Sequence, residues 1–458
     1  MLRSEIRIWW TRSTRMLTGA AGTGVLAVAG ALRNRWLAQH LDTAGIGILA
    51  QVMSVQTWIG TAAGLGLSLS VARAVSASRG ENREAAPRAF WAATTIAAAV
   101  GGAAAVVGLV AAADISRLVL GTTEYAALIG ISMLGAAGMA LWAPLQGFFA
   151  GRSDVRAGLT FALAGGGGAA LLAFLLVPRF GLAGAAVAVT LLYPLGLVGA
   201  ALFHAPAHTE ALLPLPRPLG AAVSAEAGGL LRVAGAALAL SLLDQGIMVA
   251  LRVHYLKANG PAANGLLQAA LALSQQVGAV FYAYLGGYAF GKISGLAGAG
   301  PIRDYTQRHF APIFLLAVAA MALAAAGSTP LLRLLYSHRF DAARPLMALA
   351  LWGELGRVAV QVAALGSLAL GGTRLWFAIG VSQPVLLAGA YAFFVARGAG
   401  EQSLPSAYAT AAWATLLVAL ALLARRGVTL DGRALLLLAA GCALLGLLAW
   451  LIVSASTG

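Results

Sequence analysis

Long apolar stretches follow one another along nearly the whole chain and constrain its fold more than any other feature. A helix needs roughly 20 mostly apolar residues to cross a membrane. About thirteen stretches approach or exceed this length: 16–32, 44–72, 90–114, 124–149, 157–177, 182–203, 230–252, 262–290, 309–327, 345–369, 375–396, 406–424 and 434–453. Hydrophobic residues make up 60% of the chain, charged residues 10%, and the mean hydropathy is +0.86. This composition is far more apolar than that of a soluble domain. We therefore expect an all-α integral membrane protein with about 13 transmembrane helices.

The short loops between these stretches carry arginine, which predicts the orientation. Of the 30 Lys and Arg residues, 19 fall on the side of the N-terminus, 10 on the other side, and Arg357 within a span. The positive-inside rule therefore predicts a cytoplasmic N-terminus. Thirteen spans would place the C-terminus outside and twelve inside, and the Arg425–Arg426 pair ahead of the last stretch favours thirteen. The net charge of +15 is spread over many loops, so anionic membrane lipid is its expected counterpart and nucleic acid is not.

Short similar motifs in distant segments suggest that the chain consists of two related halves. Residues 31–37 read Ala-Leu-Arg-Asn-Arg-Trp-Leu and residues 250–256 read Ala-Leu-Arg-Val-His-Tyr-Leu, an offset of 250 − 31 = 219 that Gln56 and Gln275 share. In both halves a long apolar helix follows, from Gly47 onward and from Gly265 onward. Ala, Leu and Arg are common in this chain, so chance is the alternative explanation.

A true repeat would give each half six spans, an even number, so both halves would enter from the same side. We then expect two six-helix lobes related by a pseudo-two-fold axis along the membrane normal, an arrangement known among transporters. The predicted division is an N-terminal lobe at 1–203, a cytoplasmic linker at 204–229, a C-terminal lobe at 230–424 and an extra helix at 425–458.

Three segments carry a resemblance to a known family: 37–47, 64–73 and the connection 331–346. With them the chain resembles the multidrug/oligosaccharidyl-lipid/polysaccharide (MOP) exporter superfamily, and within it the flippases of lipid-linked O-antigen and polysaccharide precursors. The resemblance implies a V-shaped pair of lobes around a cavity that opens alternately to each side. It also implies a polyprenyl-pyrophosphate-linked saccharide as cargo, a bacterial cytoplasmic membrane, and partner polymerases and glycosyltransferases. The thirteenth span and the Ala- and Gly-rich helices depart from the family pattern.

Moving an anionic headgroup through hydrocarbon requires cations or dipoles inside the protein. Arg33 and Arg252 occupy equivalent positions at the ends of their spans, where they could clamp such a group or simply snorkel to the interface. Arg357 lies well inside its span, with Glu354 and Gln361 on the same helix face. Glu354 and Arg357 are therefore either substrate-binding residues or a neutralised pair that joins helices.

Further polar residues interrupt the apolar helices. Asp244 could bind a proton or sodium ion for coupling, or accept a structural hydrogen bond. Gln56 and Gln275 could bind sugar hydroxyls, or bond between helices; the same alternatives apply to Gln51, Gln146, Gln268 and Gln276. Four tryptophans could stack on sugars or anchor their helices at the interface: Trp58, Trp142, Trp352 and Trp376. The glycine run 165–168 favours close helix packing or a hinge.

No cofactor and no metal site is expected, because the histidines lie scattered and Cys442 is the single cysteine. The favoured function is a flippase for a lipid-linked saccharide. A cation-coupled multidrug exporter shares the fold but should have an acidic cavity. A polysaccharide polymerase or ligase should have a large outer loop, and the longest here is about 328–344. We therefore expect a transporter and not an enzyme.

Overall fold

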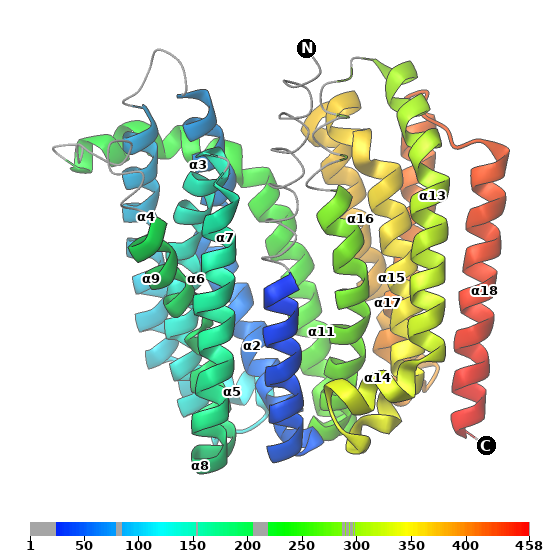
Figure 1. The fold of residues 1–458 in the computed structure, drawn as a ribbon, viewed down its shortest axis with the longest axis horizontal. Helices are drawn as coiled ribbons and strands as arrows, with labels where there is room; N and C mark the ends of the chain where they lie inside the picture. Colours follow the sequence, from blue (N-terminus) through cyan, green and yellow to red (C-terminus); the bar gives the residue numbers. More distant parts are fainter. Residues whose placement is uncertain are drawn as a thin grey trace, which may run out of the picture. The chain divides into compact units, whose positions relative to one another are not determined.

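The computed structural model describes residues 24–78, 85–152, 154–204, 219–285 and 298–457, together with 289, 293 and 296, and these form helices joined by short turns (Figure 1).

The described residues group into two compact units: unit 1 takes in residues up to Leu41 and Gln51–Leu242, and unit 2 takes in Asp42–Ala50 and Leu243 onward. Unit 1 contains a helix at residues 24–40, most of α2 (Thr43–Gly64), α3 (Leu67–Ala77), α4 (Ala85–Val110), α5 (Ala112–Leu120), α6 (Ala126–Arg152), α7 (Val155–Phe161), a π-helical segment (Ala162–Gly167), α8 (Gly168–Thr190), α9 (Leu192–His204) and the first part of α11 (Leu219–Tyr284). Unit 2 contains the first turns of α2, the rest of α11, α13 (Ala299–Ala326), α14 (Ser328–Leu335), a 3-10 turn (His338–Ala343), α15 (Arg344–Ala363), α16 (Ser367–Ala396), α17 (Ser403–Ala424) and α18 (Gly432–Thr457).

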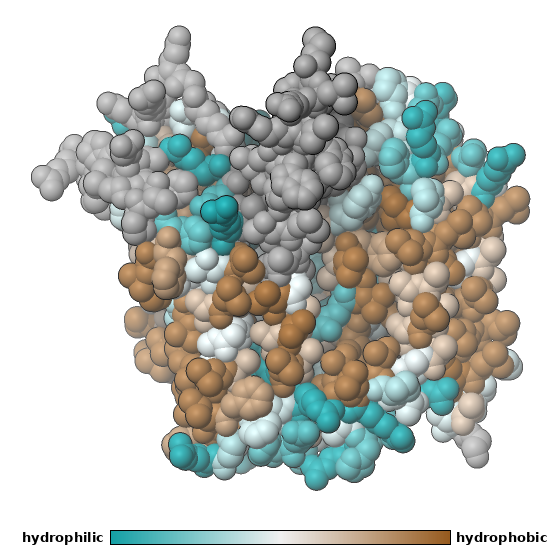
Figure 2. Space-filling model, viewed as in Figure 1, coloured by the Kyte–Doolittle hydropathy of each residue, from teal (hydrophilic) through white to brown (hydrophobic). Residues whose placement is uncertain are grey.

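Ten helical runs among the described residues are long and apolar enough to cross a membrane. Their outward faces stay apolar: Val110 is 83% exposed, Leu323 73% and Leu436 73%. Figure 2 shows hydrophobic side chains along the helices and hydrophilic ones gathered toward the helix ends. Such continuous exposed apolar surface is the pattern of a chain whose solvent is lipid. The chain is a multi-pass helical membrane protein.

Two of these runs are about twice the length of a single span. The run Arg156–His204 is 49 residues long and Ala234–Tyr284 is 51. Each contains one glycine with non-helical backbone angles, Gly181 (φ 52°, ψ −126°) and Gly260 (φ 87°, ψ 169°), at the point where the sequence separates two predicted spans. Only glycine adopts such angles without steric cost. The count of thirteen spans itself stays a prediction.

The predicted span 44–72 is wrong as a single helix. Helix α2 ends at Gly64 and α3 begins at Leu67, because Leu65 (φ 48°) and Gly66 (φ 63°) both adopt left-handed backbone angles. Hydropathy is blind to this break, since both sides of it are apolar. Left-handed angles are costly for a leucine, so the surrounding packing must hold the turn in place.

Small residues bring the helices of unit 1 close together. The core between α3, α4 and α6 contains Leu67, Phe90 and Phe148 together with fully buried alanines such as Ala93. In the glycine run 165–168, a Cβ on Gly165 would lie 2.6 Å from the carbonyl oxygen of Leu192 in α9. The close-packing interpretation of this run is therefore confirmed.

In unit 2, Gly47 and Gly265 lie close together. They are the glycines from which the two paired apolar helices of the sequence begin. A Cβ on Gly47 would lie 2.0 Å from the carbonyl oxygen of Pro261, and one on Gly265 would lie 1.9 Å from that of Thr43. The side chain of Asn264 donates a hydrogen bond to the carbonyl oxygen of Gly47 at 2.7 Å. The start of α2 thus touches α11 backbone to backbone, which only glycine at both positions permits.

The segment 331–346 forms an amphipathic connection between α13 and α15. Helix α14 and the following 3-10 turn are joined by the side chains of Arg333 and Asp341, whose Nη2 and Oδ2 atoms lie 2.7 Å apart. The hydrogen bonds that Arg333 donates to the Asp341 carboxylate raise the pKa of the Arg333 guanidinium. Both groups are exposed enough that the pair contributes little to stability.

Several predictions concern residues outside the described ones. They include most of the predicted linker 204–229, the start of the first span 16–32, and the inner-side basic residues Arg3, Arg7, Arg12, Arg15, Arg79, Arg83, Arg217 and Lys292. The predicted division into lobes at 1–203 and 230–424 also stays a prediction.

Candidate functional site

A buried carboxylate in unit 2 is held by two tyrosines. Glu354 of α15 is fully buried. Tyr282 of α11 donates a hydrogen bond to its Oε1 at 2.6 Å, and Tyr408 of α17 donates to its Oε2. Three helices therefore converge on one carboxylate, and both of its oxygens are hydrogen-bonded. A buried carboxylate is costly unless hydrogen-bond donors reach its oxygens, and the two tyrosines supply them.

Arg357 joins the same group through Tyr408. Its Nη1 donates to the Tyr408 hydroxyl at 2.8 Å, and the guanidinium lies 5.6 Å from the centre of the Tyr408 ring. The predicted direct pair of Glu354 and Arg357 is thus replaced by a relay through a phenol. Gln361 does not share their surroundings, because its side chain is exposed.

Glycines leave the room that this group needs. A Cβ on Gly278 of α11 would lie 2.1 Å from Oε1 of Glu354, and one on Gly353 would lie 2.6 Å from the Tyr408 ring. Larger residues at either position would push the carboxylate or the phenol away from its partners.

Arg252 is the most deeply buried basic side chain among the predicted site residues. It is 6% exposed and donates through Nη2 to Oε1 of Gln268, one helix segment further along α11. Arg33, its predicted counterpart, is half-buried in the helix at 24–40 of unit 1.

Gln56 and Gln275 share a sequence offset but not an environment. Gln56 is buried against Gly135 of α6, where a Cβ would lie 2.4 Å from its Nε2, and the Thr190 hydroxyl lies 3.4 Å from its Oε1. Gln275 is exposed. Gln56 therefore bonds between helices of unit 1, while Gln275 leaves its amide open.

Asp244 lies half-buried in α11 and makes no hydrogen bond or ion pair with any other described residue. It thus differs from Glu354, whose carboxylate accepts hydrogen bonds from two tyrosines. Sequence reasoning gave the two acids different candidate roles, and their surroundings in the structure differ as well.

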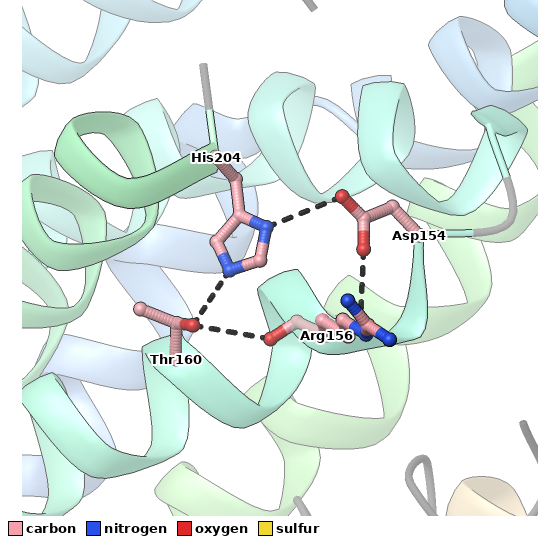
Figure 3. A network of polar contacts seen from close by, with 4 residues as sticks. All are labelled: Asp154, Arg156, Thr160 and His204. Carbon is pink, nitrogen blue, oxygen red and sulfur yellow. Dashed lines mark hydrogen bonds and ion pairs between the residues drawn. The ribbon is translucent and has the colours of Figure 1, made fainter. Parts of the chain in front are cut away.

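A polar cluster in unit 1 was missed by sequence reasoning, which treated the histidines as scattered. His204, the last residue of α9, places Nδ1 3.2 Å from Oδ2 of Asp154 and Nε2 2.6 Å from the hydroxyl of Thr160 (Figure 3). Asp154 also caps α7 by accepting the backbone N–H of Arg156 at 3.1 Å. The cluster fastens the start of α7 to the end of α9. His204 lies 44 residues from Thr160 and 50 from Asp154 in sequence, so no local pattern could reveal the cluster.

Within the described ranges, no three His, Cys, Asp or Glu side chains gather in a way that could hold a metal ion.

Comparisons with known proteins place the fold. No family model matches the chain, and no curated protein matches it. A lipid II flippase, MurJ, in an inward closed conformation superposes with a TM-score of 0.72 at 13% identity, over 96% of this chain and 98% of that one. The chain shares its fold with MOP-superfamily transporters.

Two further solved structures agree with this. An inward-facing multidrug resistance MATE transporter of the same superfamily gives a TM-score of 0.70 at 16% identity, over 88% of this chain and 94% of that one. A MOP-superfamily transporter from Pyrococcus furiosus, described as having a binding pocket of reverse polarity, gives 0.56 at 15% identity, over 90% and 94%. The resemblance to the superfamily is confirmed at the level of the fold. The proteins of similar fold include both flippases and drug exporters.

Proposed function

We propose that this protein translocates a lipid-linked oligosaccharide or polysaccharide precursor across the cytoplasmic membrane by alternating access. The observation that carries the proposal is the match to a lipid II flippase, which extends over 96% of this chain and 98% of the flippase. The cargo would be a saccharide on polyprenyl pyrophosphate, supplied by glycosyltransferases and used by a polymerase. The protein would act as a transporter and catalyse no bond chemistry.

The charges in the described spans favour an anionic cargo. Arg252 is buried and donates to the amide of Gln268, and its guanidinium would bind a pyrophosphate or an acidic sugar. Arg357 would assist if cargo displaced its bond to Tyr408. The carboxylate of Glu354 is already bound by Tyr282 and Tyr408, which lowers its value as a site for a cationic drug. We place Arg33 and Gln275 among the further cargo contacts; Gln56 would join them only by giving up its bond to Thr190.

The proposed architecture has thirteen spans, with two six-helix lobes at 1–203 and 230–424, a linker at 204–229 and an additional helix at 425–458. The kinks at Gly181 and Gly260 support counting two spans in each of the two long runs. The close contact between Gly47 and Gly265, which lie near the starts of the paired apolar helices, supports a parallel repeat. The arginine distribution supports a cytoplasmic N-terminus, with inner-leaflet anionic lipid around it.

The second candidate is a cation-coupled multidrug exporter. It is favoured by the MATE transporter match and by the carboxylate of Asp244, which could carry a proton or sodium ion. In the flippase, Asp244 would serve the same coupling role.

The decisive experiment is deletion of the gene followed by analysis of lipid-linked saccharides on each membrane face, with a membrane-impermeant oxidant applied to right-side-out and inverted vesicles. A flippase predicts accumulation of inward-facing saccharide lipid. Unchanged glycan with increased sensitivity to cationic dyes would instead establish the exporter.

Complementation with Arg252→Gln tests the cationic residue. Losing one charge-assisted contact of about 1.5–3 kcal/mol should lower the transport rate roughly tenfold or more. The matched control is Arg425→Gln, an exposed arginine after α17, which should transport like wild type at equal expression. Full complementation by folded Arg252→Gln would remove Arg252 from the site.

A further inference from the structure

A cavity of about 420 Å³ lies inside unit 1, between α2, α3, α6, α7, α9 and the start of α11. Among the residues that line it are Thr61, Ser68, Trp142, Gln146, Phe161 and Tyr193. This volume is in the range of small-molecule sites in proteins. None of the described residues that line it is an Asp, Glu, Lys or Arg, so this part of the lining favours neither a cation nor an anion.

One side of the cavity is aromatic. The rings of Trp142 and Phe161 stack with centroids 4.0 Å apart and an interplanar angle of 19°, and Tyr193 lies 5.9 Å from Phe161. Flat aromatic faces with polar edges suit a ligand that is apolar on one side and polar on the other. The axial C–H face of a sugar ring has this character.

The polar groups of the cavity are uncharged and available. The amide of Gln146, the phenol of Tyr193 and the hydroxyl of Ser241 line the cavity, and none of them is hydrogen-bonded to another described residue. They are also not sealed from solvent, since none of their polar atoms is a buried orphan. An acyl chain in the cavity would bury these groups without partners, at a cost of about 1–3 kcal/mol each. A polyhydroxy ligand would satisfy them.

The walls are fixed from several directions. The strained turn at Leu65–Gly66 borders the cavity, and α2 and α3 are tied to α11 by Trp58, which donates to the carbonyl of Leu242 at 3.2 Å, and by Ser70, which donates to that of Leu230 at 2.7 Å. The His204 cluster (Figure 3) fastens α7 to α9. These two helices carry Phe161 and Tyr193. A site held in this way is preorganised for its ligand.

We propose that this cavity binds one neutral sugar unit of the transported saccharide, with the ring stacked on Trp142 and its hydroxyls bonded to Gln146 and Tyr193. The site rests on the proposed function and adds to it a contact for the glycan that is separate from the arginines. It would let the protein distinguish a glycosylated lipid from the bare lipid pyrophosphate.

The test is saturation-transfer NMR on the full chain in sugar-free detergent, with methyl α-glucoside, N-acetylglucosamine, N-acetylgalactosamine and maltose as probes. At least one probe should show transfer, with the dissociation constant weakened tenfold or more by Gln146→Leu and by Tyr193→Phe. Ala143→Leu, which fills the cavity while keeping its polar groups, should abolish binding. Gln39→Leu, an exposed glutamine of unit 1 outside the cavity, is the matched control and should bind like wild type.

Thermal unfolding of each variant establishes that it is folded. Absence of transfer for all probes, equal binding by wild type and the three cavity variants, or loss in these variants of hexane or tetraphenylphosphonium binding in place of sugar would overturn the proposal. The two proposals fail separately. Saccharide lipid that accumulates on deletion without probe binding removes only the sugar site, and probe binding without accumulation removes only the flippase.

Discussion

Tyr408 holds the position on which the buried polar group of unit 2 depends. Its hydroxyl donates to Glu354 and accepts from Arg357, while Tyr282 makes a single bond to the same carboxylate. A phenol is suited to this because it is both donor and acceptor. Removing one oxygen atom from Tyr408 would leave an arginine without that acceptor and a carboxylate with one donor fewer.

We therefore expect Tyr408→Phe to destabilise the protein more than Tyr282→Phe. Each lost bond to a charged group costs about 1.5–3 kcal/mol, and Tyr408→Phe loses two. The measurement is thermal unfolding of the purified variants in one detergent. A larger loss for Tyr282→Phe would mean that the relay through Tyr408 contributes little.

At the scale of the residue, sequence reasoning found the charged members of this group and missed the tyrosines. Glu354 and Arg357 stand out because a charge in a hydrophobic helix is conspicuous. Tyr282 and Tyr408 do not, because tyrosine is common at the ends of membrane helices and their partner is on another helix. His204 was missed for the same reason, since Asp154 and Thr160 approach it only after folding.

At the scale of the element, hydropathy locates helices well and their breaks poorly. The predicted spans 406–424 and 434–453 correspond to α17 (Ser403–Ala424) and α18 (Gly432–Thr457) within a few residues. The span 44–72 fails because a left-handed Leu65 leaves no trace in hydropathy. Contacts that depend on glycine are equally invisible until the partner backbone is known.

The contact between α2 and α11 predicts a sharp difference between two glycines of one helix. In Gly265→Ala the new methyl group would stand 1.9 Å from the carbonyl oxygen of Thr43, whereas Gly235→Ala would meet nothing within 4 Å. Because a backbone atom cannot step aside, Gly265→Ala should lose about 1–3 kcal/mol or fail to fold. Gly235→Ala should match or exceed wild type, since alanine favours the helix.

Yield of monodisperse protein and its melting temperature measure this difference. Equal behaviour of the two variants would show that α2 and α11 do not approach each other as closely as their glycines indicate.

At the scale of the whole molecule, the number of spans decides on which side of the membrane the C-terminus lies. Thirteen spans and a cytoplasmic N-terminus place the C-terminus outside. A C-terminal alkaline phosphatase fusion should then be active, and a fusion truncated after Gly427, ahead of α18, inactive. The reverse pattern with a green fluorescent reporter serves as the control. A phosphatase that is inactive at the full-length end would contradict the thirteen-span arrangement.

Alanine is the commonest buried hydrophobic residue in the described part of the chain. Ala92, Ala93 and Ala97 of α4 and Ala407 and Ala411 of α17 are buried with 0% exposure. With so little side chain to remove, trimming creates small voids, whereas adding a methyl group forces neighbouring backbones apart. Alanine codons turn into valine codons by one base change, so much of the damage from random mutation should come from swaps that leave hydrophobicity untouched. Ranking variants of this protein by polarity would overlook them, and ranking by added volume would find them.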